Sequence, residues 1–79
     1  MPTVLTDGPY RIAFWSQDCA EPAHMHVFRD NKSAKFWLET GAIAVNHGFR
    51  RKELREISRL IAEHQSLLQE KWNEHCRRA

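Results

Sequence analysis

Two histidines separated by a single residue are the most chemically suggestive feature of this 79-residue sequence. His24 and His26 lie in the segment Glu-Pro-Ala-His-Met-His-Val, residues 21–27, which has the composition of a strand entered from a loop. Side chains two residues apart on a strand project from the same face of its sheet. Two imidazoles on one face are suited to binding a metal ion or to acting as an acid–base pair.

A metal site at this motif needs more ligands than two imidazoles, because protein-bound zinc takes three or four side chains. The residues that could complete such a set are Asp18, Cys19, Glu21 and the more distant His47. In the alternative interpretation the two rings are structural polar groups that pair with Glu39 or neighbours of Lys35, or pack on aromatic rings. We therefore predict no cofactor and no metal, with His24 and His26 as the candidates should a metal bind.

Catalysis has little support in the sequence. There is no Ser-His-Asp set, glycine-rich phosphate loop or paired-carboxylate motif. RNase-like chemistry needs only an acid, a base and a cation, and His24 and His26 would be the catalytic pair if the protein were an enzyme. Nothing in their spacing demands it, so we favour a non-enzymatic role and leave an enzyme as an alternative.

A basic cluster opens the second half of the chain, with Arg50, Arg51, Lys52, Arg55 and Arg59. Three of its members have the i, i+4, i+8 spacing that stacks side chains on one flank of a helix, namely Arg51, Arg55 and Arg59. The same spacing predicts partial neutralisation in two pairs, Lys52–Glu56 and Arg59–Glu63. The flank is suited to phosphates or an acidic protein surface, and the alternative is an ordinary solvated helix face.

Length and composition predict one domain over residues 1–79. Its hydrophobic content of 42% and charged content of 28% are typical of a globular protein, and a net charge of +2 does not by itself indicate nucleic-acid binding. The first residues lack the features of a secretory leader, and no apolar run reaches the ~20 residues that span a bilayer. We expect a cytoplasmic protein without membrane contact, in which Cys19 and Cys76 are free thiols, a single bridge between them being the alternative.

The alternation of apolar and polar residues predicts a small antiparallel sheet of three to five strands. The strands are expected over residues 3–6, 10–15, 24–29 and 34–39, with a short edge strand over 42–46 left open. Asp30 and Asn31 form the predicted two-residue turn, because both residue types tolerate positive φ. This turn sets three cross-strand pairs: Val27 with Ala34, Met25 with Phe36, and His24 with Trp37.

The alternation also divides the sheet into two faces. The predicted core face carries Ile12, Phe14, Met25, Val27, Phe36 and Leu38. The opposite face carries Arg11, Ala13, Trp15, His24, His26, Phe28, Lys35 and Trp37. Three large aromatic side chains are unusual on a solvated face. We therefore expect either that the first strand, residues 41–49 or a helix end covers this face, or that a partner binds it.

From Arg50 onward the periodicity becomes helical. One stripe carries Leu54, Ile57, Ile61, Leu68, Trp72 and His75, and it is interrupted at residues 64–66. The sequence thus predicts an α+β fold in which the sheet packs on a long C-terminal amphipathic helical segment over residues 50–77. That segment is either continuous or kinked or split near residues 63–66.

The chain resembles the small prokaryotic family called domain of unknown function 4160. The matching segments are residues 2–4, 10–12, 14–16, 21–27, 34–38, 48–49, 53–54 and 72–74. The most specific match is the Pro-x-His-x-His-Val motif that begins at Pro22. The chain departs from the family at Ala23, where a second proline is typical, and this leaves both histidines in place.

The resemblance implies no catalytic residue. Family members are similar to small proteins encoded beside another uncharacterised domain, in pairs that look like toxin–antitoxin modules. This implies a protein partner, and a nucleic-acid target reached directly or through that partner. Such domains also travel on mobile elements, so an inhibitor of a host nucleic-acid defence complex, of the anti-CRISPR kind, is a second expectation.

We therefore expect a non-enzymatic protein-binding module, one half of a toxin–antitoxin-like pair. The alternatives are the mobile-element inhibitor, and direct nucleic-acid binding or a histidine-based nuclease-like toxin. Aromatic and arginine side chains are enriched in binding hot spots, which selects the contact residues. These are Trp15, His24, His26, Phe28 and Trp37 on the sheet, and Arg51, Arg55 and Arg59 on the helix. The oligomeric state stays open.

Overall fold

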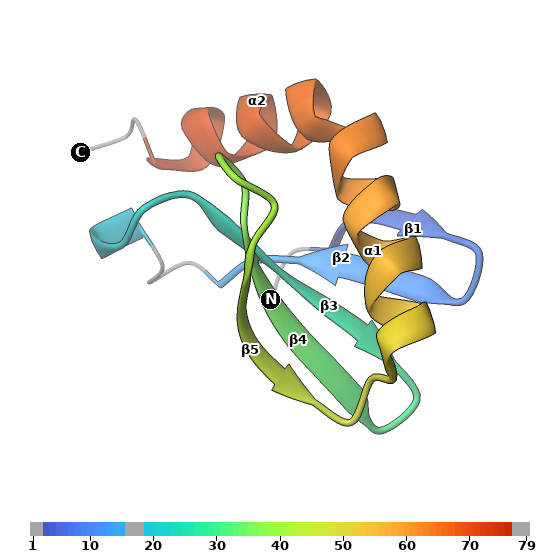
Figure 1. Ribbon diagram of the computed structural model, residues 1–79. Coiled ribbons are helices and arrows are strands. Elements are labelled where there is room, and N and C mark those ends of the chain that lie inside the picture. Colours follow the sequence, from blue (N-terminus) through green and yellow to red (C-terminus); the bar gives the residue numbers. More distant parts are fainter. Residues whose placement is uncertain (1–2, 16–18, 77–79) are drawn as a thin grey trace.

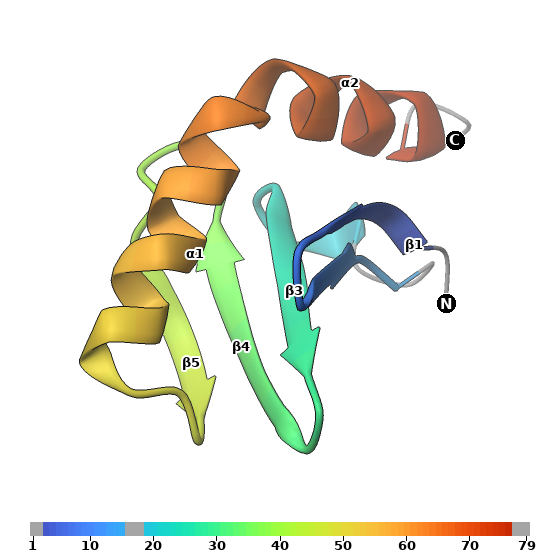
Figure 2. The ribbon, with the colours of Figure 1, turned by 90° about the vertical axis from the view of Figure 1, so that its right-hand side faces the viewer.

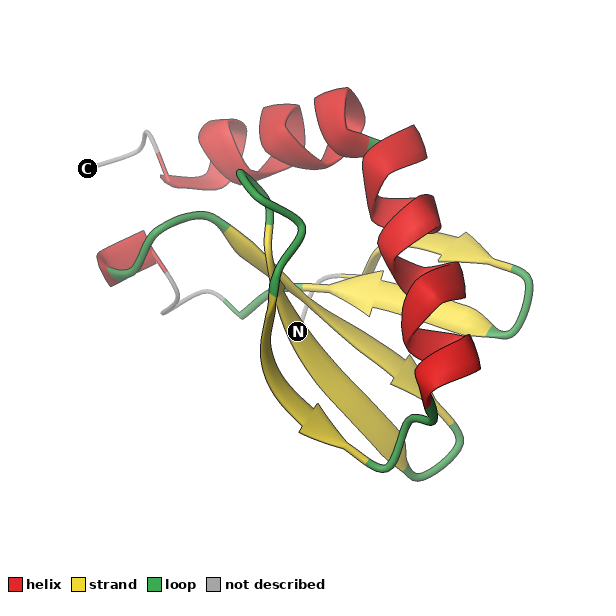
Figure 3. Ribbon diagram, viewed as in Figure 1, coloured by secondary structure: helices red, strands yellow, loops and turns green. Residues whose placement is uncertain are grey.

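A five-stranded antiparallel sheet followed by two helices makes up the computed structural model, which describes residues 3–15 and 19–76 (Figure 1). The strands lie side by side in the order of the sequence: β1 (Thr3–Asp7), β2 (Tyr10–Ala13), β3 (His24–Arg29), β4 (Lys32–Trp37) and β5 (Ile43–His47). Helices α1 (Arg51–Glu63) and α2 (Gln65–Cys76) follow the last strand (Figure 3). The predicted α+β fold class is confirmed.

The turn between β3 and β4 has the predicted position. Asp30 adopts a positive φ of 54°, and the ladder resumes at once with Arg29 opposite Lys32. All three predicted cross-strand pairs are present. Strand β4 begins two residues earlier than predicted, because β3 and β4 are paired up to the two turn residues, Asp30 and Asn31. It ends at Trp37, where the chain turns back and Gly41 N–H donates to the Trp37 carbonyl oxygen over 2.8 Å.

Strand β3 has the predicted bounds, and the other strands differ from the predicted ones by one or two residues at one or both ends. β1 extends to Asp7, and β2 ends at Ala13, although Phe14 beyond it is still buried. The fifth strand forms over Ile43–His47. The register shifts between the Lys35–Val45 and Phe36–Ile43 pairs, which leaves Ala44 as an extra residue in β5.

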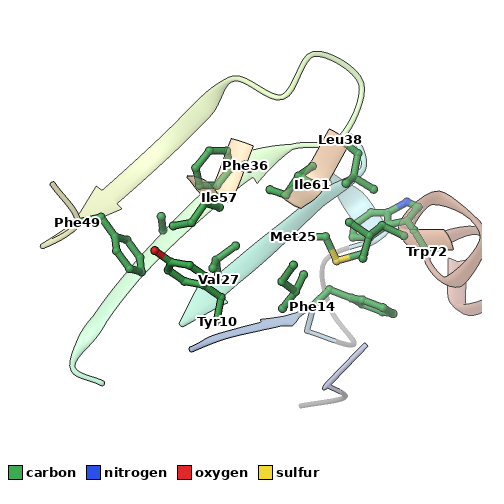
Figure 4. Close-up of a cluster of buried hydrophobic side chains, with 13 residues drawn as sticks. Tyr10, Phe14, Met25, Val27, Phe36, Leu38, Phe49, Ile57, Ile61 and Trp72 are labelled. Atoms are coloured by element: carbon green, nitrogen blue, oxygen red, sulfur yellow. The ribbon is translucent and has the colours of Figure 1, made fainter. Parts of the chain in front are cut away.

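The core lies between the sheet and the helices. All six residues of the predicted core face are at most 3% exposed, and four residues of the predicted helical stripe join them: Ile57, Ile61, Leu68 and Trp72 (Figure 4). Tyr10 and Phe49 close one end of this cluster, with ring centroids 6.1 Å apart. Alternation along the strands and helical periodicity were therefore sufficient to identify most of the core.

The helical segment is split into two helices, which was one of the predicted alternatives. α1 ends at Glu63 and α2 begins at Gln65, and the two helices form an L in both ribbon views (Figures 1 and 2). Side chains at the corner tie it to the sheet. His64 Nε2 lies 3.2 Å from the carboxylate of Asp7, and Gln65 Nε2 donates to the Leu38 carbonyl oxygen over 3.1 Å. The stripe is therefore interrupted where polar side chains bind the sheet. Residue 77, the predicted end of the segment, lies outside the described residues.

Two glutamates of α1 bind residues of the sheet. Glu53 accepts a hydrogen bond from the backbone N–H of Arg50, and it pairs with Lys32 Nζ at 3.1 Å and with Arg29 Nη1 at 3.5 Å. That backbone hydrogen bond, followed by the two cations, holds the pKa of Glu53 below its ordinary value. Together these contacts anchor the start of α1 to the β3–β4 hairpin.

Glu56 accepts a hydrogen bond from the Tyr10 hydroxyl over 2.9 Å. Burial, followed by this bond, raises the pKa of Tyr10. The predicted ion pairs Lys52–Glu56 and Arg59–Glu63 do not form, although the structure describes all four residues. Tertiary contacts with the sheet take precedence over i,i+4 pairing for Glu56.

A disulfide joins Cys19 to Cys76, with their Cα atoms 5.5 Å apart. The prediction of free thiols is wrong, and the alternative of a single bridge is the one that forms. The bridge is possible because α2 returns to the loop that precedes β3, which brings together two residues 57 positions apart in the chain. No helix in the described ranges is long and apolar enough to cross a bilayer.

Candidate functional site

His24 is fully buried at the start of β3, with 0% of its surface exposed. Its ring centroid lies 5.0 Å from Trp72 and 5.7 Å from Trp37, and its Nδ1–H donates to the Pro22 carbonyl oxygen over 2.9 Å. For His24, the alternative that a helix end covers this face therefore applies. A helix end covers it, because the large indole of Trp72 reaches over the end of the strand.

His26 is half-buried and is the histidine of the pair that reaches the surface. Its ring is edge-on to Trp15, with centroids 6.0 Å apart, and roughly parallel to Phe28 at 6.4 Å. The rings of His24 and His26 are 5.2 Å apart, so the strand does bring both to one face, as predicted. Their environments differ because only the first lies beneath α2.

Two cations lie over aromatic rings of the same face. The guanidinium carbon of Arg11 is 5.0 Å from the centre of Phe28, and Lys35 Nζ is 4.7 Å from the centre of Trp37. Both distances are within the range of favourable cation–π contacts. Lys35 also forms an ion pair with Glu21 from the loop before β3.

These side chains form a surface that we call the outer sheet face, defined by Arg11, Trp15, His26, Phe28, Lys35 and Trp37. A hollow of about 250 Å³ lies in it, lined by Trp15, His26, Phe28, Ser33, Ala34, Lys35, Val45 and His47. Trp15 and Val45 are 40% and 41% exposed, which makes them two of the few large apolar side chains at the surface of the described chain. The outer sheet face thus combines apolar, aromatic and cationic groups around a shallow concavity.

The potential metal ligands that the structure describes do not assemble into a site. The described ranges contain no group of three histidine, cysteine or carboxylate side chains that could hold a metal ion. Cys19 is bonded to Cys76, and Asp18 lies outside the described residues. His47 and His26 both line the hollow of the outer sheet face.

The three arginines of the predicted helix flank are exposed on α1. Arg51 and Arg55 border a second hollow, of about 410 Å³, with Ile43, Leu54 and Ser58. Because α1 packs on the core side of the sheet, this flank does not join the outer sheet face. The two surfaces predicted from the sequence are therefore separate, and β5 contributes to both through Val45 and Ile43.

Sequence reasoning missed Ile43 and Val45 as surface features, although Ile43 is 45% exposed. Their signal was present: two apolar β-branched residues alternate in a short segment that was left open as an edge strand. An edge strand contacts one neighbour only, so part of its apolar surface stays in solvent.

Neither the curated proteins nor the solved structures include a match to this chain. The family comparison does find one. The model of the domain of unknown function DUF4160 matches residues 10–73, which includes the sheet from β2 onward, all of α1 and most of α2. The chain belongs to the DUF4160 family.

Proposed function

We propose that this protein is a non-enzymatic protein-binding module whose outer sheet face contacts a partner protein. The observation that carries the proposal is the set of half-buried and exposed aromatic rings on this face, together with their cations. Aromatic side chains and arginine are enriched among the residues that contribute most to protein–protein binding, and contiguous exposed apolar patches often mark interaction sites.

A protein partner fits this face better than a nucleic acid does. Single-stranded nucleic acids bind to aromatic rings whose faces are open for base stacking. Here Arg11 lies over Phe28 and Lys35 lies over Trp37, so these ring faces are already in contact with cations. The net charge of +2 also provides little attraction for a phosphate backbone.

A histidine-based nuclease has less support than a binding module. Acid–base catalysis requires that the acid and the base both reach the substrate. His24 is covered by Trp72, so a substrate at the outer sheet face would meet His26 without its predicted partner.

We further propose that the protein acts in the cytoplasm as one half of a toxin–antitoxin-like pair. The Cys19–Cys76 disulfide is the observation that bears against a cytoplasmic location, because stable disulfides are rare there. Trapping thiols with an alkylating agent at the moment of cell lysis tests the location. In the cytoplasm we expect the bridge to be reduced, so that both cysteines are alkylated, and complete protection of both would contradict this location.

The test of the proposed function is affinity capture of the tagged protein from its native host, with and without nuclease. We expect a protein to co-elute in both cases, and its recovery to fall at least tenfold with Trp15→Ala or Lys35→Glu. Glu70→Ala, an exposed change on α2, is the matched control and should leave recovery unchanged. Equal recovery with all variants would remove the proposal.

The identity of the captured protein separates the remaining alternatives. The product of a neighbouring gene supports the toxin–antitoxin-like pair, and a subunit of a nucleic-acid defence complex supports the mobile-element inhibitor. The three exposed arginines of α1 favour direct nucleic-acid binding as a second candidate function. That candidate predicts binding that weakens steeply with salt, and a flat salt dependence would exclude it.

A further inference from the structure

We propose that the groove between β5 and α1 is a second docking site, which takes an extended acidic segment of a protein partner as a sixth strand of the sheet. This inference rests on the proposed protein-binding function and names a partner chemistry for a different surface. Its basis is the combination of an open strand edge, an apolar groove beside it and arginines that pair with no carboxylate of residues 3–15 and 19–76.

The strand edge is open. β5 is the last strand of the sheet and pairs with β4 alone (Figure 2). Four of its five residues are exposed, and among the described residues no backbone hydrogen bond outside the sheet ladder involves Ile43–His47. Such an edge presents unpaired N–H and C=O groups that an extended peptide can satisfy. The extra residue Ala44 bends the strand, so regular pairing is expected over residues 45–47.

The groove beside this edge is apolar at its centre. Ile43 and Leu54 line the hollow of about 410 Å³ between β5 and α1. An adjacent hollow of about 280 Å³ shares Ser58 with the 410 Å³ hollow. It continues past Thr40 and Gly41 toward the start of α2. A side chain of an added strand would therefore enter an apolar space and displace water from Ile43, which is 45% exposed.

The charge at the groove selects an acidic partner. Arg51 and Arg55 border the hollow of about 410 Å³, and Arg59 follows one turn further along α1. None of the three lies within 4.0 Å of a carboxylate in the described part of the chain, whereas Arg29 and Lys32 at the nearby hairpin both pair with Glu53. Carboxylates on an added strand would supply the missing counter-charges. A phosphate backbone could supply charge too, but it would leave the strand edge and Ile43 without complementary groups.

The probes for the test are two fluorescein-labelled eight-residue peptides with the repeats Val-Thr-Glu-Thr and Val-Thr-Lys-Thr, which place Val and the charged residue on the same face of a strand. We expect saturable anisotropy with the acidic peptide alone, and amide shift changes centred on Ile43–His47 in nitrogen-15 NMR spectra. The double variant Arg51→Glu, Arg55→Glu should weaken binding at least tenfold, and Ile43→Lys should do so as well. Lys52→Glu, which changes charge on the same helix outside the hollow, is the control and should bind normally.

Several outcomes would overturn the inference. These are equal binding of both peptides, wild-type affinity of the double variant, or shift changes confined to the outer sheet face. Binding of a twelve-nucleotide RNA that the double variant loses, with no peptide binding, would assign the arginines to nucleic acid. A dimer that Ile43→Lys dissociates would assign the edge to a second copy. The proposed function fails separately, because its test uses Trp15 and Lys35 on the other surface.

Discussion

The imidazole of His24 lies against the indole of Trp72, with ring centroids 5.0 Å apart, and this contact joins the start of β3 to the C-terminal half of α2. Phe14 extends the contact, since its ring lies 5.6 Å from Trp72 and 5.1 Å from His75. One end of the core is therefore built from aromatic side chains of β3, of α2 and of Phe14, which follows β2. The same contact removes one histidine of the most conspicuous sequence motif from the surface.

Truncation of Trp72 should be among the most destabilising single changes. Trp72→Ala deletes a buried indole and exposes His24 and Phe14, so we expect a loss of about 3–5 kcal/mol in the free energy of unfolding. Urea denaturation followed by circular dichroism measures it. Lys71→Ala, an exposed change on the same helix, is the control and should cost under about 0.5 kcal/mol. Similar costs for both variants would contradict the packing described for α2.

Reduction of the disulfide should destabilise the fold without abolishing it. The bridge spans 57 positions, and closing a loop of that size in the unfolded chain is worth roughly 2–4 kcal/mol. We expect a fall of that size with dithiothreitol, measured by urea denaturation. Cys76→Ser should show the same loss and no further response to the reductant. An unchanged midpoint after complete reduction would contradict the bridge.

The Tyr10–Glu56 hydrogen bond predicts a dependence of stability on alkaline pH. The pKa of Tyr10 is raised in the folded protein above the ordinary value of 10.0, so the folded state favours the protonated hydroxyl. Its contribution is fully present below that value and is lost as the pH rises through the folded pKa. Tyr10→Phe should cost about 1 kcal/mol at neutral pH. It should also flatten the decline in unfolding free energy above pH 10, and parallel pH profiles would count against this account.

Glu53 predicts the opposite behaviour at acid pH. Its pKa is lowered in the folded protein from the ordinary value of 4.5, so its contribution is present above that value and is lost as the pH falls through the folded pKa. Glu53→Gln should lower the thermal midpoint at pH 7 and reduce its acid dependence below pH 4.5. Glu63→Gln, an exposed change at the far end of the same helix, should leave that acid dependence in place. If both variants retain it equally, Glu53 does not anchor α1.

Much of the fold could be predicted because it depends on local patterns. Strand alternation identified the core face from Ile12 to Leu38, and the turn at Asp30 set the register of β3 and β4. The break near His64 was visible as an interruption of the apolar stripe. These features depend on neighbours in the sequence, so one sequence is enough to infer them.

The rest depends on contacts between residues far apart in the chain. The disulfide could not be inferred, because it depends on the direction in which α2 leaves the corner at His64. Burial of His24 depends on the same geometry. Glu56 binds Tyr10 instead of its helical neighbour for a similar reason: its partner comes from β2, 46 positions away. The periodicity of the sequence does not indicate which distant residues will be in contact.

The most direct test of the central claim is oxidative footprinting of two of the three tryptophans, Trp15 and Trp72, by mass spectrometry, on the protein alone and in its native complex. Trp15 is 40% exposed on the outer sheet face, whereas Trp72 is buried at 6% and serves as the internal reference. If the outer sheet face binds the partner, oxidation of Trp15 should fall several-fold in the complex while that of Trp72 stays low in both samples. Unchanged oxidation of Trp15 in a fully assembled complex would contradict the proposal.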